Sequence, residues 1–462
     1  ALAVNEPAPI TLAPGKITLN FDISANINPL PTQDQWNQFI QTFAANDPLV
    51  GHVNLTVSQH YVTQAASHSD CFYLTQNAVA DLSESAVLSL DPYLTADATF
   101  DKTDLLGGIL NAVQRDNKTW AFPLTLEPMV MIYDADKFNH AGLPAPSSGW
   151  TIDAFVDALQ HLKVTNPADP TTTPPFVGSG DGTPLLTLIA DYGGLPIDYR
   201  TSPPTINFTD PATVTAIQQV LDLAKNSEIA YGALGDLFNR NSPSWNQTTA
   251  MFNIDLNNLN FLKGNPKGRA QMFSNPQTAL FPTGHKYTGV AYDLGTAYIS
   301  ATAQNPDACY RFIRALADHS ELFWNMPVRQ STLGSASYKS ITNADTLALY
   351  SRIAAQLADP HTLPFPISVS DGSGSFSILF PQHWLFEAFD AYMLNHADLA
   401  TALNTADQQS KGYLGCIANL PPLNLSDVGI NNVSAIRPYA TCAETVEPAL
   451  RAQLEPLFGR SS

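Results

Sequence analysis

The chain has 462 residues and a formal net charge of −19 at pH 7, because 41 aspartates and glutamates outnumber 22 lysines and arginines. This length predicts two or three domains with ample core, and a mean hydropathy of −0.07 is ordinary for a globular protein. So few basic residues exclude the basic surface that nucleic acids or anionic lipids require. No apolar run approaches the roughly 18 residues that span a bilayer.

The first predicted elements are a strand, a helix and a second strand. Residues 16–23 and 52–59 alternate apolar and polar side chains, which is the period of a strand. Between them, Thr32 and Gln35 fit a capping box at the start of a helix with one apolar stripe. The residues of that stripe are Trp36, Phe39, Ile40 and Phe43. A strand, a helix and a strand in this order indicate a βαβ unit and a mainly parallel sheet.

Residues 129–133 form an apolar run that predicts a buried strand, yet Glu127 and Pro128 stand directly before it. Proline cannot donate to a sheet ladder, and a carboxylate is costly to bury. One interpretation is a proline at a sheet edge beside a solvated glutamate. The pair therefore raises a question about where this strand starts.

Three further helices are predicted by a capping residue followed by apolar residues at helical spacing. The capping residues are Thr151, Asp210 and Asn305, and a proline follows the last two. Segments rich in proline and glycine separate these units as loops. The sequence has no internal repeat and no long linker, so we expect the domains to be intimately joined, with the chain crossing between them more than once.

Signatures of common catalytic and cofactor sites are absent from the sequence. There is no GxxxxGK[ST] loop, no GxSxG elbow, no HExxH pair and no dinucleotide fingerprint. The glycine-rich stretch 178–182 lacks the lysine of a phosphate loop, which favours a flexible loop. His52, His60 and His68 are spaced by eight residues, or roughly 26 Å in an extended segment, too far to share a metal. We therefore expect no cofactor, no metal and no catalytic residues.

The four cysteines, Cys71, Cys309, Cys416 and Cys442, show neither CxxC spacing nor a metal-ligand pattern. An even count suits disulfides in an oxidising compartment, and buried free thiols are the alternative.

Residues 117–162 resemble the crossover segment of the extracellular solute-binding proteins of ABC importers, family 1, the class that includes maltose-binding protein. The resemblance rests on an aromatic-proline turn, an apolar strand from Met129 to Tyr133, an Ala-Gly-Leu-Pro motif and a helix led by Trp150. Further matching pieces follow in family order at 192–199, 206–225, 295–317, 326–331 and 399–417.

The resemblance implies an α/β fold of the periplasmic-binding-protein type II, with two lobes that are each a mainly parallel sheet flanked by helices. The implied segments are a spacer (1–15), lobe 1 (16–126 and 296–340), lobe 2 (127–295 and 341–417) and a C-terminal extension (418–462). The chain would cross between lobes at Glu127–Pro128, again within 291–300 and a third time around 335–350. At a hinge Pro128 need not complete a ladder, and Glu127 can face water or ligand.

The implied function is capture of a small solute, a sugar or oligosaccharide, in the cleft between lobes and its delivery to an ABC permease. Aromatic rings stack on sugar faces, and carboxylates, amides and arginines bind the hydroxyls. By position in the family pattern, the candidate ligand-binding residues are Tyr73, Glu127, Tyr192, Gly193, Phe252, Asp255, Tyr292, Asp293, Arg329 and Trp384. Trp384 aligns with a family tryptophan that stacks on sugar, and a core position is the alternative.

The resemblance also favours a Cys416–Cys442 disulfide and permits a Cys71–Cys309 disulfide within lobe 1, with Cys309 as a core thiol the alternative. We expect an extracytoplasmic protein, at the cell surface or in the periplasm, attached to the membrane only through a removed or lipidated N-terminal segment. Nucleic acid is not an expected partner.

Two other functions are compatible with the sequence. The first is a surface structural, assembly or adhesin protein that reuses the fold with a degenerate cleft and associates with itself. The second is a secreted carbohydrate-active enzyme, for which Glu127 and Asp293 are the one carboxylate pair that suggests itself.

Overall fold

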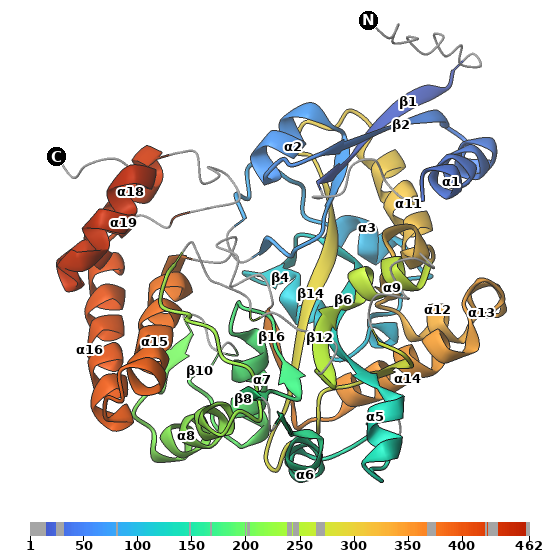
Figure 1. The fold of residues 1–462 in the computed structure, drawn as a ribbon. Helices are drawn as coiled ribbons and strands as arrows, with labels where there is room; N and C mark the ends of the chain where they lie inside the picture. Colours follow the sequence, from blue (N-terminus) through green and yellow to red (C-terminus); the bar gives the residue numbers. More distant parts are fainter. Residues whose placement is uncertain are drawn as a thin grey trace, which may run out of the picture.

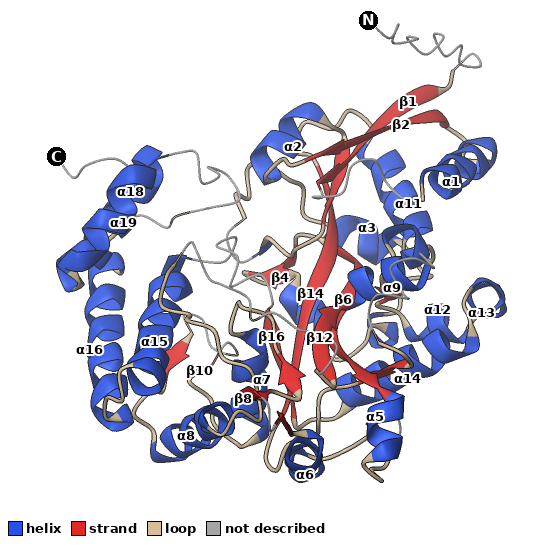
Figure 2. Cartoon of the chain, viewed as in Figure 1, coloured by secondary structure: helices blue, strands red, loops and turns tan. Residues whose placement is uncertain are grey.

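The structure is a computed structural model. It describes residues 15–24, 32–79, 82–146, 149–166, 169–198, 200, 204–237, 243, 249–264, 273–366, 376–420, 423 and 433–458. In this part of the chain, helices surround a central group of strands, as Figures 1 and 2 show. None of the helices described here combines the length and the hydropathy that a membrane span requires.

The strands and helices follow one another in mixed order along the chain. The strands are β1 (Ile17–Ser24), β2 (Val50–Ser58), β3 (Cys71–Leu74), β4 (Gln114–Arg115), β5 (Lys118–Thr119), β6 (Phe122–Asp134), β7 (Val164–Asn166), β8 (Asp169–Thr173), β9 (Phe176–Val177), β10 (Ile197–Asp198), β11 (Thr205–Ile206), β12 (Met251–Asp255), β13 (Pro276–Ala279), β14 (Thr288–Ile299), β15 (Met326–Pro327) and β16 (Thr362–Pro366). The α-helices are α1 (Gln33–Asn46), α2 (Val62–His68), α3 (Asp91–Ala96), α4 (Ile109–Ala112), α5 (Ala135–His140), α6 (Ile152–Leu162), α7 (Thr183–Asp191), α8 (Pro211–Lys225), α9 (Leu256–Gly264), α11 (Pro306–Leu316), α12 (Gln330–Gly334), α13 (Ala336–Ile341), α14 (Ala344–Ala358), α15 (Phe376–Leu394), α16 (Leu399–Ile417), α18 (Val433–Val446) and α19 (Arg451–Phe458). Three short 3-10 helices are η2 (Lys102–Asp104), η4 (Ser320–Phe323) and η6 (Pro448–Leu450).

The main sheet has the strand order β2-β1-β3-β14-β6-β12-β9, with β13 and β15 also beside β6 and β16 beside β14. Strand β1 runs parallel to β2 and β3, as the predicted βαβ unit requires. The long strands β6 and β14 are antiparallel to each other, and β14 is antiparallel to β3. The sheet is therefore mixed where the prediction had mainly parallel sheets, because two strands return through its centre in opposite directions.

Strands β6 and β14 run through the middle of the molecule and change partners at the same level (Figure 1). The first half of β6 pairs with β14 as far as Pro128, which lies opposite Tyr292, and from Met129 onward β6 pairs with β12 and β13. On β14, residues 288–292 pair with β16, and the following residues pair with β6 and β3. Pro128, which has no N–H to donate, thus stands at the end of one ladder, where that loss costs least.

The four helices predicted from local sequence signals are present as α1, α6, α8 and α11. The side chains of Thr151 and Asp210 accept hydrogen bonds from the backbone N–H groups of Ala154 and Thr213, so the predicted caps of α6 and α8 are confirmed. The capping box at Thr32 is wrong, because its hydroxyl donates to the Leu322 carbonyl and makes no cap hydrogen bond. Asn305 precedes α11 but also makes no side-chain cap hydrogen bond.

Both disulfides form, Cys71 with Cys309 and Cys416 with Cys442, and each pair has a Cα–Cα distance of 5.8 Å. The first joins β3 to α11 in a core cluster that also contains fully buried Trp36. The second joins α16 to α18. The alternative of a free core thiol at Cys309 is therefore wrong in this structure.

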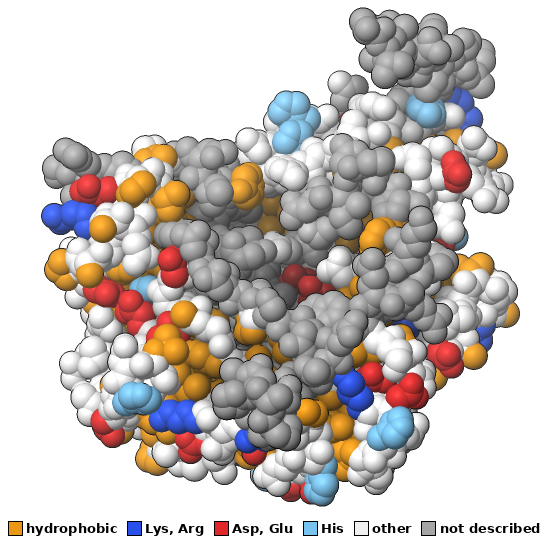
Figure 3. Space-filling model, in the orientation of Figure 1, with side chains coloured by type: hydrophobic (Ala, Val, Ile, Leu, Met, Phe, Trp, Pro, Cys, Tyr) orange, Lys and Arg blue, Asp and Glu red, His pale blue; other side chains and the backbone are white. Residues whose placement is uncertain are grey.

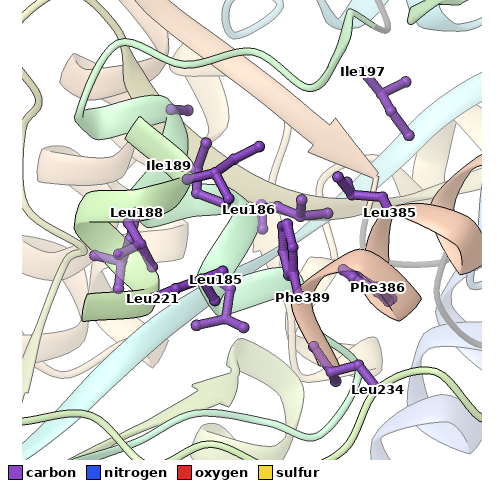
Figure 4. Close-up of a cluster of buried hydrophobic side chains, with 14 of the residues drawn as sticks. Leu185, Leu186, Leu188, Ile189, Ile197, Leu221, Leu234, Leu385, Phe386 and Phe389 are labelled. Carbon is purple, nitrogen blue, oxygen red and sulfur yellow. The ribbon is translucent and has the colours of Figure 1, made fainter. Parts of the chain in front are cut away.

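The C-terminal helices share one core with α6, α7 and α8. Leu385, Phe386 and Phe389 of α15 pack against Leu185 and other leucines of α7, as Figure 4 shows. Helices α16, α18 and α19 lie beyond α15 (Figure 1) and contribute to the same cluster. The described part of the predicted extension, 418–462, is thus integrated with the body of the protein because it covers the apolar helix α15.

Candidate functional site

A cluster of carboxylates lies where β6 and β14 change partners. Glu127 and Asp293 are directly opposite each other in the antiparallel register. Glu127 is only 9% exposed, and the Asn325 side-chain amide donates to its Oε2 at 3.2 Å. Burial foremost, then the charges of Asp255 and Asp293, raises the pKa of Glu127 to about 8. Glu127, which we expected to face water or ligand, therefore has little contact with water, and its contact with a ligand stays a prediction.

Asp255 extends this cluster from the last position of β12. It lies opposite Met129, two residues beyond Glu127 on β6. Burial foremost, then the charge of Asp181, raises the pKa of Asp255 to about 6, and a hydrogen bond with Asn258 opposes that shift. Glu127, Asp255 and Asp293 therefore form a compact anionic group, referred to below as the crossing carboxylates.

Tyr73 reaches the same face of the sheet from β3. Its hydroxyl lies 2.8 Å from the Thr125 hydroxyl, and its ring centroid is 4.2 Å from that of Phe323. Burial, together with the charges of Glu127 and Asp293, raises the pKa of Tyr73 well above its usual value, although the Thr125 hydrogen bond opposes this. The bond passes over Gly295, where an added Cβ would lie 2.0 Å from the Tyr73 oxygen.

One aromatic pair, at the residue before Asn325, was not among the candidates predicted from the sequence. Trp324 immediately precedes Asn325, and its ring centroid lies 5.0 Å from that of Phe261, which is 43% exposed. Trp324 has a φ of 57°, a left-handed conformation that is uncommon and costly for a bulky residue. The signal in the sequence was Phe323-Trp324-Asn325, three polar or aromatic residues directly before β15.

Two other candidate residues, one on β14 and one on β12, are near the crossing carboxylates in sequence, but their side chains are largely packed against neighbours. Tyr292 is partly buried next to Asp293, and burial raises its pKa to about 12. Phe252 on β12 is 8% exposed and packs against Phe273 at 5.3 Å between ring centroids. Both stay predictions as ligand contacts.

Tyr192 and Gly193 follow the C-terminal end of α7. The Tyr192 ring meets that of His285 at 6.3 Å between centroids, and Gly193 has a φ of 92° beside Lys286. These neighbours belong to the loop before β14, whereas Asp293, the crossing carboxylate on β14, lies in the middle of that strand. The structure therefore does not bring Tyr192 and Gly193 to Glu127.

Arg329 and Trp384 are engaged elsewhere. Arg329 forms ion pairs with Asp104 and Asp318, each at 3.0 Å. Trp384 is completely buried, its indole N–H donates to Glu447 at 2.6 Å, and its ring packs against that of Tyr413. Neither side chain is included in the site proposed below.

The predicted distance of roughly 26 Å between His60 and His68 is wrong. His60 and His68 do not lie far apart, because the chain turns after β2 and α2 brings their ring centroids to 5.2 Å. Among the residues the structure describes, one group offers three ligand atoms within 4.8 Å of one another, His383, Glu387 and Glu447. That group belongs to α15 and the segment after α18, far along the chain from the crossing carboxylates.

The face of the molecule shown in Figure 3 is hollowed near its centre, and acidic atoms are visible at the bottom of the hollow. The crossing carboxylates and the Asn325 amide offer hydrogen-bonding groups, and the Trp324–Phe261 pair offers apolar surface. Such groups can bind the hydroxyl groups and the apolar faces of a polyhydroxylated ligand.

A family model described as bacterial extracellular solute-binding protein matches residues 33–321. No protein with a curated function matches the sequence.

Three solved structures of similar fold are 15–16% identical to this chain. An ABC substrate-binding protein from Listeria monocytogenes in complex with cycloalternan has 16% identity and a TM-score of 0.60, covering 87% of this chain and 99% of its own. The cyclic alpha-maltosyl-1,6-maltose binding protein from Arthrobacter globiformis has 15% identity and a TM-score of 0.62, covering 85% and 98%. A Mycobacterium tuberculosis protein in complex with glycerophosphocholine has 16% identity and a TM-score of 0.59, covering 86% and 98%. These similarities confirm the two-lobed fold.

Proposed function

We propose, from the premise that the chain belongs to the bacterial extracellular solute-binding protein family, that it captures a sugar or an oligosaccharide and delivers it to an ABC permease. The family is one of extracytoplasmic binding proteins. An N-terminal lipid anchor that holds the protein near the permease is part of the proposal.

The observation that carries the proposal is the position of the crossing carboxylates, at the level where both long strands change partners. Residues at this level contact both halves of the molecule, so a ligand bound there would hold the two halves together. Asp255 and Asp293 supply acceptors for hydroxyl groups, and Trp324 with Phe261 supplies flat apolar surface. Glu127, with a pKa raised to about 8, is a hydrogen-bond donor at neutral pH as well as an acceptor.

We further propose that the halves move as lobes about this level, in the division given by the sequence, with the third crossing around 335–350. In keeping with that division, the Tyr350 hydroxyl of α14 accepts a hydrogen bond from the side-chain amide of Asn260 in lobe 2 at 2.8 Å, and Tyr350 shares a core cluster with Ile132 and Phe252 of that lobe. Strand β16 pairs with β14 at residues 288–292, also within lobe 2. Closure about a few residues at such crossings is the usual hinge motion of two-lobed binding proteins.

Thermal unfolding against a panel of ligands tests the proposal. The panel contains cyclic glucans, disaccharides, polyols and glycerophosphocholine, because the names of similar structures give ligands of these classes, and linear α-glucans are added for comparison. A ligand that binds only the folded protein raises Tm in a concentration-dependent way. We expect a shift with one sugar class.

Two tryptophan variants make the test specific. Trp324→Ala should abolish the ligand-induced shift while leaving most of the stability, because the side chain is partly exposed. Trp384→Phe should lower Tm without ligand and keep the ligand-induced shift, because Trp384 lies in the core. A shift that survives Trp324→Ala contradicts the proposed site. No shift with any compound, from a protein that elutes as a large assembly, contradicts the function and favours a structural role.

A further inference from the structure

His383 and Glu387 lie one turn apart on α15, so their side chains share a face of the helix. The Nε2 atom of His383 is 3.4 Å from Oε1 of Glu387. Leu385 and Phe389, which pack against α7, lie on the opposite face, since each residue advances about 100° around a helix. The His383–Glu387 pair therefore faces away from α7, toward the C-terminal helices.

Glu447 completes the group from a distant part of the chain. It follows α18, and its Oε2 lies 4.0 Å from Nε2 of His383. The indole N–H of Trp384 donates to the same oxygen at 2.6 Å. Such a hydrogen bond to a ligating carboxylate is how neighbouring residues orient metal ligands. The Cys416–Cys442 disulfide, five residues earlier, ties this segment to α16.

The ligand atoms of the group lie close together. His383 offers a nitrogen, Glu387 and Glu447 each offer an oxygen, and the three atoms all lie within 4.8 Å of one another. One imidazole and two carboxylates are ligands that a divalent transition metal accepts. Asp390 is already committed, because it accepts hydrogen bonds from Tyr231 and from the backbone N–H groups of Leu234 and Gly235.

We propose that His383, Glu387 and Glu447 bind a divalent transition metal, Zn²⁺ by ligand type, which fastens the C-terminal segment to α15. Ligand atoms on a tetrahedral Zn²⁺ lie roughly 3.3 Å apart, so the 3.4 Å pair fits and the 4.0 Å pair must shorten by about 0.7 Å. His383 is fully buried, whereas the Glu387 side chain is 36% exposed, which leaves a path for the ion and a fourth position for water.

The test measures zinc bound to the full chain after loading with ZnCl₂ and gel filtration. We expect about one Zn²⁺ per chain by mass spectrometry of the metal, a Tm that rises with Zn²⁺ and falls on addition of EDTA, and a Co²⁺ form with visible d–d absorption. Glu387→Gln and Glu447→Gln keep the size of each side chain and should each weaken Zn²⁺ binding tenfold or more. If Glu447→Gln fails to fold, the zinc content of Glu387→Gln decides the test, because Glu387 is the more exposed of the two glutamates.

His161→Asn is the matched control, since His161 forms an exposed pair with Asp157 at the same helical spacing on α6. It should bind zinc as the natural sequence does. Equal zinc content in Glu387→Gln and the natural sequence means an adventitious ion only and overturns the proposal. Absence of bound zinc together with a Tm indifferent to Zn²⁺ and EDTA also overturns it.

Discussion

Glu127 of β6 and Asp293 of β14 stand directly opposite each other in an antiparallel pair, so two carboxylates share one face of the sheet at the level where both strands change partners. Like charges in that arrangement are destabilising in an ordinary sheet. Burial and these neighbours raise the pKa of Glu127 far enough for it to be protonated at neutral pH. The pair therefore carries at most one negative charge. A ligand that donates hydrogen bonds to the pair would stabilise that charge.

The first prediction concerns Glu127→Gln and pH. The folded-state pKa of Glu127, about 8, is raised above its ordinary value of 4.5, so its contribution to stability is fully present below pH 4.5 and is lost as pH rises through 8. Glutamine removes this dependence. We expect the variant to exceed the natural sequence by on the order of 1–3 kcal/mol in free energy of unfolding at pH 8.5, and by little at pH 5.

Denaturant unfolding at several pH values measures this difference. Asp359→Asn is a suitable control, because Asp359 is exposed and its pKa is lowered, chiefly by hydrogen bonds with His361. A difference between Glu127→Gln and the natural sequence that stays constant from pH 5 to 8.5 would show that Glu127 is ionised throughout.

The second prediction is that Gly295→Ala breaks the Tyr73–Thr125 hydrogen bond. An added Cβ would meet the Tyr73 oxygen at 2.0 Å and the Thr125 hydroxyl at 2.2 Å. Overpacking of this kind costs about 1–3 kcal/mol. Gly415→Ala is the control, since nothing lies within 4 Å of its added Cβ on α16, and alanine in a helix should stabilise by about 0.5–1 kcal/mol. Equal Tm values for the two variants would contradict the close approach at Gly295.

The third prediction concerns the disulfides. The Cys416–Cys442 disulfide closes a loop with a sequence separation of 26 and the Cys71–Cys309 disulfide one of 238. Replacing either pair by serine should lower stability by roughly 2–4 kcal/mol, more for the longer loop in the chain-entropy account. Thermal unfolding of both double variants measures the loss of stability. Titration of free thiols in the natural sequence, under denaturing conditions, checks that the disulfides form. Four free thiols in the unreduced protein would refute both bonds.

The fourth prediction is acid sensitivity at Asp47. Its carboxylate pairs with Arg311 at 2.7 Å and accepts from the backbone N–H groups of Leu49 and Val50. Although burial opposes them, these bonds lower the pKa of Asp47 from 3.8 to about 2. The resulting stabilisation, roughly 2 kcal/mol, is present above pH 3.8 and is lost as pH falls through 2.

Asp47→Asn should therefore lower the free energy of unfolding at pH 7 and much less at pH 2. Guanidinium unfolding of the variant and the natural sequence at both pH values measures this difference in free energy. Arg200→Gln, which removes an exposed pair with Asp198, should change stability by less than about 1 kcal/mol at either pH.

The local patterns in the sequence determined the elements that depend on neighbouring residues. Strand β1, strand β2 and the caps of α6 and α8 follow from alternation and from Thr151 and Asp210. The resemblance in residues 117–162 led to the family, because that segment carries its own turn, strand and helix. It also predicted a crossing between lobes at Glu127–Pro128, where the structure shows β6 changing partners.

Tertiary structure alone decided how residues far apart in sequence meet. Trp384 looked like a ligand residue but is buried against Tyr413, and His60 and His68 are adjacent because α2 folds back. Asn325 reaches Glu127 across 198 positions of the chain. Such contacts depend on which strand lies beside which, and no periodicity along the sequence records that. The protonation of Glu127 follows from the same cause, because its pKa depends on the charges and the burial that β12 and β14 supply.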